Sequence, residues 1–481
     1  MFERQGRVRN VLEGGNGRLF LGDQDGFAVE WFVSDTPFSL PLSESWRRTL
    51  RRRARELKRR GIPYVFCLVP DAHFVYAEDM PPELNASEYA PPGEVFLDAQ
   101  RGLDGITFVD PRADLVEAKG LLDIYRKTDT HWTQYGSFVG YKTLARALSP
   151  LLPMSVLQAR DVTFEYRRWF GDLGVRVEPE RTEDAPRAKV TRNEYRRVYE
   201  NDGYKRMGCQ ETLAEDAAPG RALFFRDSFF TDQAEYVLRS FRHVLTAGTT
   251  TSLFLDEVDA WKPHVVVSHV GERRLYSFEW DHRRDGFDDT FRSDFSSPRG
   301  RAAQKALLLR DDGRPDDALA SIEGFEADPE LRPDHAYVAA QVLLAAGQFA
   351  RAAASIAVSL ASYPGRASYL SVAAMIAFAR GEFREAVALA ERAIDAAPYN
   401  GHHHQVYSWI LLNSGETARV RRHLAATLSH IDDFSVLWYQ SSLACEAVGD
   451  KLGASDAIVQ ALMLNSSEAS FRDQAMKLWQ N

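Results

Sequence analysis

Two short segments of the chain combine the side chains needed for nucleophilic catalysis. Residues 128–133 have the sequence Thr-Asp-Thr-His-Trp-Thr, and residues 226–229 have the sequence Arg-Asp-Ser-Phe. Ser228 is the candidate nucleophile, because a serine hydroxyl attacks a carbonyl once a base removes its proton. His131 is the candidate base, and Asp129 is the candidate carboxylate that orients its ring. These residue types predict a hydrolase or an acyltransferase with an acyl-serine intermediate.

The segment around Ser228 also allows a purely structural interpretation. The apolar run at residues 222–225 predicts a short buried strand, and the following residues predict a helix that ends at about Phe241. Serine and aspartate commonly cap the first turn of a helix. In the alternative interpretation, Ser228 or Asp227 caps this helix and takes no part in catalysis. A helix start also presents backbone amides that can stabilise an oxyanion during acyl transfer.

Further residues in turns or beyond predicted strands are candidates for substrate binding or oxyanion stabilisation. They are Asp71, His73, Asp172, Arg226 and Arg273. Most of them have a structural alternative. Asp71 and His73 belong to the exit from a predicted strand, and Asp172 lies in a Gly-Asp-Leu-Gly turn within a long irregular stretch. Arg273 follows the last predicted strand, where it is alternatively part of a structural ion pair with Glu272.

The histidines and cysteines outside these segments give no metal-site pattern, and we predict no metal. The three cysteines are far apart and form neither a metal-spaced pair nor a disulfide framework: Cys67, Cys209 and Cys445. His402, His403 and His404 are adjacent on a predicted helix and must point in different directions. They are therefore predicted to be polar residues at the surface.

Length, composition and charge narrow the class of protein. A chain of 481 residues with 45% hydrophobic residues is long enough for two or three domains. The formal net charge of −9 argues against general nucleic-acid binding. The sequence shows no membrane-spanning segment and no signal peptide. These features predict a cytoplasmic protein, or a periplasmic one if an N-terminal segment is missing from the sequence.

The C-terminal part contains an internal repeat of 34 residues. Glycines recur at this interval, at Gly313, Gly347, Gly381, Gly415 and Gly449. Five positions after each glycine, four copies have alanine and the copy that begins at Gly415 has Val420. The alanines are Ala318, Ala352, Ala386 and Ala454. This period is typical of tetratricopeptide repeats, in which a glycine turn joins two helices. We predict five repeats over residues 299–468 and a capping helix over residues 469–481, with a concave surface that binds a protein partner.

The N-terminal domain, residues 1–285, alternates helices with strands, and a linker is predicted over residues 286–298. Such alternation predicts an α/β fold with a mostly parallel sheet and helices on both faces. Ligands bind beyond the carboxyl ends of strands in these sheets. Ser228, Asp71 and His269 are expected at such ends. The predicted helices cover residues 43–60 and 135–147, and the predicted strands cover residues 64–69, 107–109, 222–225 and 265–269.

Several segments of this domain together resemble the alginate O-acetyltransferases of the AlgX and AlgJ type, within the SGNH hydrolase-like superfamily. They follow the family order over roughly residues 8–280: residues 11–21, 60–65, 69–76, 128–136, 171–173, 227–229 and 262–273. The resemblance implies that Ser228 is the nucleophile, His131 its base and Asp129 the partner of the base. It also implies the chain order Asp, His, Ser, which is the reverse of that in ordinary SGNH hydrolases.

The resemblance further implies transfer of acetyl groups to hydroxyls of exported polysaccharides. The sequence departs from the family at Arg226, where SGNH proteins generally have glycine, and at Ala72-His73, where many relatives have a lysine. The resulting hypothesis is a carbohydrate O-acetyltransferase with no bound cofactor, an unidentified acetyl donor and a sugar or glycan acceptor. The alternatives are a carbohydrate acetylesterase and a non-catalytic scaffold for polysaccharide assembly.

Overall fold

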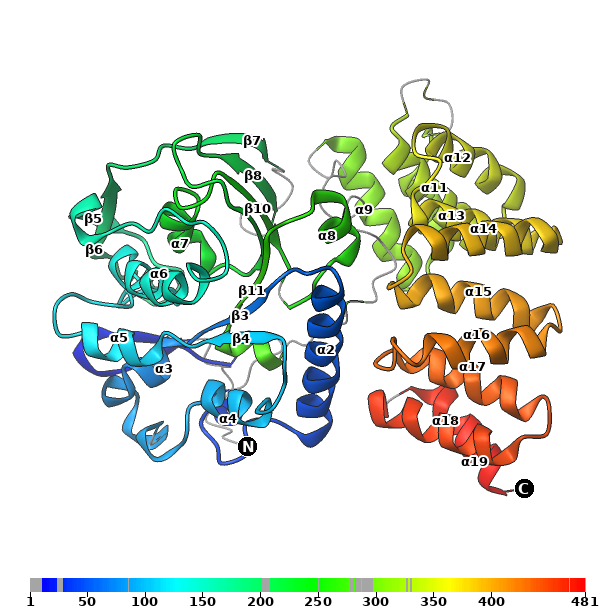
Figure 1. The fold of residues 1–481 in the computed structure, drawn as a ribbon, viewed down its shortest axis with the longest axis horizontal. Coiled ribbons are helices and arrows are strands. Elements are labelled where there is room, and N and C mark those ends of the chain that lie inside the picture. Colours follow the sequence, from blue (N-terminus) through cyan, green and yellow to red (C-terminus); the bar gives the residue numbers. More distant parts are fainter. Residues whose placement is uncertain are drawn as a thin grey trace. The chain divides into compact units, whose positions relative to one another are not determined.

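The computed structural model divides the chain into two units (Figure 1). The first unit comprises Met1–Leu253 and Trp261–Glu279, and the second comprises Phe254–Ala260 and Trp280–Asn481. The structure describes residues 11–23, 29–84, 86–200, 208–249, 251–276, 281, 287, 297–325, 328, 331–466 and 468–480. The predicted linker over residues 286–298 falls largely outside these described residues.

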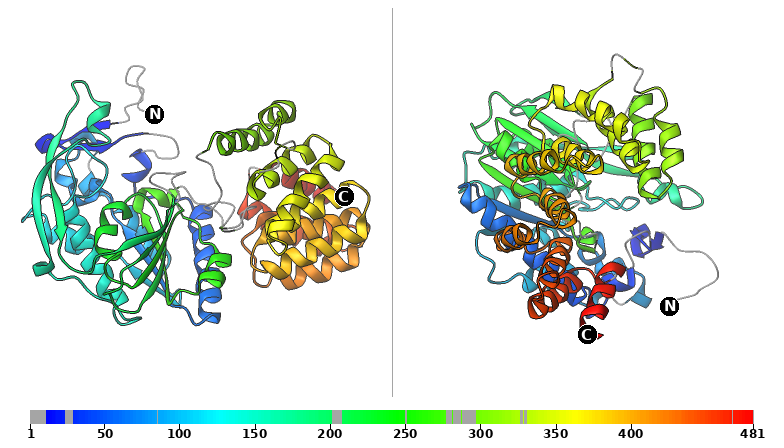
Figure 2. Two further views of the ribbon diagram at one scale, coloured as in Figure 1. Left: turned by 90° about the horizontal axis from the view of Figure 1, so that it is seen from above. Right: turned by 90° about the vertical axis from the view of Figure 1, so that its right-hand side faces the viewer.

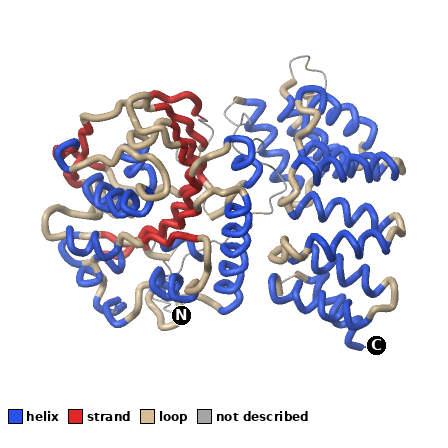
Figure 3. Tube along the Cα trace, viewed as in Figure 1, coloured by secondary structure: helices blue, strands red, loops and turns tan. Residues whose placement is uncertain are grey.

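A seven-stranded sheet forms the centre of the first unit. Its strands, in order across the sheet, are β4 (Ile106–Val109), β3 (Tyr64–Val69), β11 (Val265–Gly271), β9 (Arg221–Arg226), β10 (His243–Gly248), β8 (Cys209–Leu213) and β7 (Arg196–Glu200). Neighbours from β4 to β10 pair in parallel, and β8 and β7 continue the sheet in antiparallel pairing. The prediction of a mostly parallel sheet is confirmed, and Figure 3 shows the strands of this sheet in red.

Helices cover both faces of this sheet, as predicted. The helices of the first unit are α1 (Val29–Phe32), α2 (Leu40–Arg59), α3 (Ala72–Val75), α4 (Pro92–Ala99), α5 (Arg112–Ala118), α6 (Gln134–Leu148) and α7 (Phe230–Val237), whereas α8 (Leu255–Trp261) falls almost entirely in the second unit. On one face, Phe66 of β3 packs against Trp46 of α2, with ring centroids 5.9 Å apart. On the other face, Val65 shares a hydrophobic core with Leu144 of α6. Because both faces are covered, every residue of β3 and β11 is buried, which explains the continuous apolar sequence of β3.

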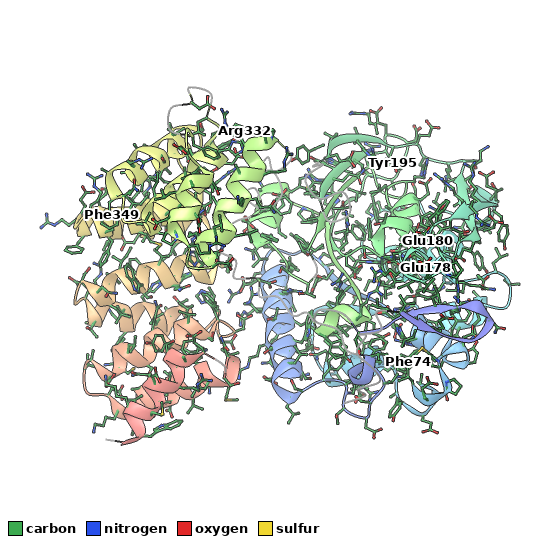
Figure 4. The ribbon with its side chains drawn as sticks, turned by 180° about the vertical axis from the view of Figure 1, so that it is seen from behind. Phe74, Glu178, Glu180, Tyr195, Arg332 and Phe349 are labelled. Carbon is green, nitrogen blue, oxygen red and sulfur yellow. The ribbon has the colours of Figure 1, made fainter. Side chains whose placement is uncertain are left out.

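Two β-hairpins lie outside the central sheet. β1 (Val11–Glu13) pairs with β2 (Leu19–Leu21), and Phe74 of α3 packs against the apolar cluster of this hairpin (Figure 4). β5 (Val162–Trp169) pairs with β6 (Glu183–Val190). Sequence reasoning missed this second hairpin, because most residues of β5 are exposed and give no alternating apolar pattern. Short 3-10 helices occur at Gly15–Gly17, Ala77–Asp79, Pro82–Leu84, Ala86–Glu88, Ala159–Asp161, Gly174–Arg176 and Glu272–Tyr276.

The second unit consists of helices stacked in sequence order (Figure 2). They are α9 (Pro298–Asp311), α10 (Pro315–Ser321), α11 (Pro333–Ala345), α12 (Phe349–Ser362), α13 (Ala367–Ala379), α14 (Phe383–Ala396), α15 (Gly401–Asn413), α16 (Thr417–Thr427), α17 (Ser435–Glu446), α18 (Lys451–Leu464) and α19 (Ala469–Gln480). The five repeat glycines all have positive φ, from 71° to 80°. That conformation ends one helix and turns the chain into the next, and it favours glycine. The prediction of a tetratricopeptide solenoid is confirmed.

The small residue of each repeat is buried where paired helices meet. Ala352, Ala386 and Ala454 are each 0% exposed, which lets the helix backbones approach closely. The prediction for the adjacent histidines was wrong for two of the three, because His403 and His404 are buried. Helix α15 contacts helices on more than one side, so successive positions face neighbours rather than solvent. Among the described residues, none of the helices combines the length and apolar character that membrane crossing requires.

Candidate active site

Ser228 lies in the tight turn that connects β9 to α7. The preceding residue, Asp227, fixes this turn: its Oδ1 accepts a hydrogen bond from the Phe229 amide at 3.0 Å, and its Oδ2 accepts one from the Gly271 amide at 2.6 Å. Burial by itself raises the pKa of Asp227, but the nearby His269 ring and the Gly271 amide lower it below its usual value. Asp227 therefore remains a carboxylate and ties the turn to β11.

The Ser228 side chain faces the imidazole of His131. The Nε2 atom of His131 is 2.8 Å from Ser228 Oγ, and its Nδ1 atom is 2.8 Å from Asp129 Oδ1. These distances are those of hydrogen bonds. Three residues that are up to 99 positions apart in the sequence thus form one continuous hydrogen-bonded chain, Ser228–His131–Asp129.

Asp129 is surrounded by hydrogen-bond donors. Its Oδ1 also accepts a bond from the His131 backbone amide at 2.9 Å. Its Oδ2 accepts bonds from the Trp169 indole at 2.9 Å and from the Asp172 amide at 3.2 Å. Burial raises the pKa of Asp129, but the bond from His131, the charges of His131 and Arg126 and the bond from Trp169 together lower it well below its usual value. Asp129 is therefore held ionised, with a fixed orientation toward His131.

Asp172 lies beside the same imidazole. Its two carboxylate oxygens accept bonds from the Thr130 amide at 2.8 Å and from the Thr130 hydroxyl at 2.7 Å. Its Oδ2 is 3.7 Å from His131 Nδ1. Asp129, His131 and Asp172 could in principle hold a metal ion, since their ligand atoms lie within 4.8 Å of one another. Both oxygens of Asp129 already accept hydrogen bonds from N–H groups. This arrangement fits a hydrogen-bonded His–Asp pair better than a site for a metal ion.

Trp132 joins the segment that carries His131 to the turn that carries Ser228. Its buried indole donates a hydrogen bond to the Phe229 carbonyl at 2.9 Å, and its ring packs edge-on against the Phe229 ring. Arg126 connects the same two segments, through a bidentate ion pair with Asp232 of α7 at 2.8 and 3.0 Å. The tryptophan of the Asp-x-His-Trp motif therefore helps to fix the position of His131 relative to Ser228.

The β5–β6 hairpin supplies the other support of Asp129. Trp169 ends β5, and Arg126 stacks over its ring at 3.9 Å. Glu183 begins β6 and accepts hydrogen bonds from the amides of Lys127 and Thr128. Sequence reasoning identified neither Trp169 nor Glu183, because both lie more than 35 residues from the motif in a segment without a recognisable pattern.

Gly171 is packed too closely for any side chain. A Cβ atom at this position would overlap the carbonyl oxygen of Thr128, the residue just before Asp129. The amides of Leu173 and Gly174 donate to that same oxygen, at 3.1 and 2.8 Å. The Gly171–Gly174 turn therefore docks directly against the backbone that carries Asp129.

Replacing Gly171 with alanine is expected to destabilise the protein by about 1–3 kcal/mol, the usual cost of overpacking. The displaced turn would also move the Asp172 amide away from Asp129, so any reaction that depends on the Ser228–His131–Asp129 chain is expected to slow as well. Thermal unfolding and p-nitrophenyl acetate hydrolysis measure the two effects. Gly120→Ala is the matched control, because nothing lies within 4 Å of a Cβ atom there. Equal stability and activity of both variants would contradict this account.

Arg273 and Asp71 lie close to the Ser228 turn. Arg273 Nη1 is 3.2 Å from Asp71 Oδ1, and the Arg273 amide donates to Asp71 Oδ2 at 2.9 Å. The Arg273 guanidinium also lies over the Phe229 ring, 4.8 Å from its centroid. The suggested ion pair between Arg273 and Glu272 is not what forms: Arg273 pairs with Asp71, and Glu272 pairs with Arg112 at 2.5 Å.

The other candidate residues occupy different surroundings. His73 is buried between Phe20 and Phe32, with its Nε2 2.9 Å from the Leu21 carbonyl, and so supports the first hairpin. Arg226 is the last residue of β9. Burial lowers the pKa of its guanidinium, although the negative charge of Asp227 acts in the opposite direction. His269 was expected at a strand end, but β11 continues to Gly271. The buried His269 ring packs against the rings of Trp132 and Phe230.

Comparisons with known proteins point to one family for the N-terminal part. Residues 11–229 match the family model described as the SGNH hydrolase-like domain of acetyltransferase AlgX. No curated protein matches the chain.

Among solved structures, similarity extends to both parts of the chain. The O-acetyltransferase domain of Pseudomonas putida AlgJ is 21% identical, with 56% of this chain and 94% of that chain covered and a TM-score of 0.38. PatB1 of Bacillus cereus is 14% identical, with 49% and 90% covered and a TM-score of 0.39. A thermophilic TPR protein of Thermus thermophilus is 17% identical, with 38% and 100% covered and a TM-score of 0.34.

Proposed function

We propose that this chain, whose first unit contains an SGNH hydrolase-like domain of the AlgX acetyltransferase type, is a carbohydrate O-acetyltransferase with an acyl-serine intermediate. The observation that carries the proposal is the hydrogen-bonded chain from Ser228 through His131 to Asp129, with both distances at 2.8 Å. A base in contact with the nucleophile and a carboxylate in contact with the base are the arrangement that serine-dependent acyl transfer requires.

In the first half of the reaction, Ser228 Oγ attacks the carbonyl carbon of an acetyl donor while His131 Nε2 takes the hydroxyl proton. The bond between the acetyl group and the donor then breaks, and His131 returns the proton to the leaving group. The acetyl group now forms an ester with Ser228. Asp129 stabilises the positively charged imidazole that exists between these proton transfers and keeps its Nδ1–H directed away from Ser228.

In the second half, a sugar hydroxyl attacks the acetyl-serine ester. His131 takes the proton of this hydroxyl and gives it to Ser228 Oγ as the ester bond breaks. The products are the acetylated sugar and the free enzyme, so no bound cofactor is needed. The acceptor must reach the ester before water does, because attack by water gives free acetate instead. The tetratricopeptide unit is proposed to bind a protein partner that brings the polysaccharide.

The proposal is tested with p-nitrophenyl acetate as donor and a panel of neutral and uronic-acid oligosaccharides as acceptors. Mass spectrometry of the quenched reaction is expected to find one acetyl group on the peptide that contains Ser228, and acetylated oligosaccharide among the products. Acetyl-Ser228 with free acetate alone would favour the acetylesterase. Absence of both the adduct and turnover in folded protein would overturn the proposal in favour of a non-catalytic scaffold.

A further inference from the structure

A buried imidazole and a half-buried imidazole face each other in the repeat unit, far along the chain from Ser228. His404 belongs to α15 and His423 to α16, and their rings stack with centroids 5.0 Å apart and an angle of 23° between planes. His404 Nδ1 is 3.0 Å from His423 Nε2. The Thr427 hydroxyl completes the group, at 3.2 Å from His404 Nδ1 and 3.4 Å from His423 Nε2. Two nitrogen atoms and one oxygen atom therefore converge on one point.

The protonation of His404 follows from its other ring nitrogen. His404 Nε2 is 2.9 Å from the Pro398 carbonyl oxygen, which can only accept a hydrogen bond. Nε2 therefore carries the proton in the neutral ring, and Nδ1 presents a lone pair toward His423. Histidines that bind metals have this same arrangement, in which the second nitrogen donates to a backbone carbonyl and fixes the ring.

The spacing of the two nitrogens matches a chelate with a right angle at the metal. Bonds of about 2.0–2.1 Å from an ion to imidazole nitrogen place two such nitrogens about 3.0 Å apart when the angle is 90°. The observed separation is 3.0 Å. A tetrahedral angle would need a wider separation, of about 3.4 Å with the same bonds. The pair is thus set for an ion with octahedral or tetragonal geometry, the class of Ni²⁺ and Cu²⁺.

The two rings differ in their exposure to solvent. His404 itself is only 4% exposed, whereas His423 is half-buried and gives the ion its access from solvent.

We propose that His404 and His423, with the Thr427 hydroxyl beside them, form a binding site for a divalent ion of the Ni²⁺ and Cu²⁺ class. The ion replaces the contact between the two nitrogens with two metal–nitrogen bonds. The proton that His423 Nε2 donates to His404 Nδ1 passes through solvent to His423 Nδ1, so the ring stays neutral, and water fills the remaining positions of the ion. Bound in this way, it joins α15 to α16 and stiffens the repeat that they form. The site is independent of the proposed acetyltransferase reaction.

The test is calorimetric titration of the full chain with NiCl₂ at about pH 7.5, since neutral imidazole is the form that binds a metal. We expect binding that is weakened more than about 100-fold in His404→Ala and in His423→Ala, since loss of an outer partner alone weakens metal sites by about 10–100-fold. Nickel is also expected to raise the unfolding temperature of wild type but not of these variants. Circular dichroism checks that both variants fold. If His404→Ala does not fold, because His404 is buried, His423→Ala alone provides the test.

Two controls make the outcome decisive. His402→Ala removes a histidine of the same helix whose Nδ1 is 3.3 Å from Gln405 Oε1, and this variant is expected to bind nickel as wild type does. His131→Ala removes the imidazole of the first unit and is also expected to leave binding unchanged. Binding that is lost in His131→Ala but kept in folded His423→Ala, or no binding by wild type at millimolar nickel, would overturn the proposal.

Discussion

Replacement of Ser228 by alanine is expected to reduce the hydrolysis of p-nitrophenyl acetate by about 10³-fold or more. The variant lacks the oxygen that would carry the acetyl group, and no other hydroxyl is in contact with His131 Nε2 in the described structure. His131→Ala should cause a loss of similar size, because the remaining serine has no base. The double variant should be no worse than either single variant, since residues that act as a unit have non-additive effects.

Matched substitutions separate this effect from general damage. Ser149→Ala removes an exposed serine at the end of α6, and His264→Ala removes an exposed histidine before β11. Both are expected to keep wild-type activity. If Ser228→Ala retained more than about a tenth of wild-type turnover, with the same dependence on enzyme concentration, the acyl-serine mechanism would have to be abandoned.

Sequence alone predicted the parts of the fold that produce regular patterns. β3 has the predicted bounds, Tyr64–Val69, because a strand covered on both faces is apolar throughout. The repeat glycines were equally informative, because each one adopts a backbone conformation that other residues avoid. The helix after Ser228 was predicted to end at about Phe241 but ends at Val237, and such boundaries depend on packing that a sequence pattern does not contain.

The candidate site was predicted less evenly than the fold. Motifs gave Asp129, His131 and Ser228, and the structure brings these three together with Asp172. Trp169, whose indole bonds to Asp129, was missed because it reaches the site through the pairing of an exposed hairpin. The capping alternative for Ser228 or Asp227 was wrong, because the N-cap residue of α7 is Phe229 and no side chain caps this helix. Asp227 instead fixes the turn before the helix by accepting a bond from the Phe229 amide. A residue that only positions a catalytic side chain belongs to no short motif, so a single sequence gives no pattern by which to identify it.

Asp129→Asn is expected to lower kcat by about 10³–10⁴-fold with little change in folding. An asparagine fits the same space, but its amide group can donate to His131 Nδ1 and so stabilise the wrong tautomer of the ring. The His131 ring would then present N–H, rather than a lone pair, to Ser228. Asp172→Asn is the matched control. Its carboxylate bonds to Thr130 and is 3.7 Å from His131 Nδ1, so a much smaller loss is expected.

The pH dependence of stability gives a second, independent measurement on the same variant. The pKa of Asp129 is lowered in the folded protein, so its ionised form stabilises the fold above the pKa of the unfolded chain, about 3.9. This contribution is lost as the pH falls below that value toward the folded pKa. The difference in unfolding temperature between wild type and Asp129→Asn should therefore shrink as the pH is lowered from about 5 to about 2. A difference that grew over this range would mean that Asp129 is protonated in the native state, and a protonated Asp129 could not stabilise the imidazolium that acyl transfer forms.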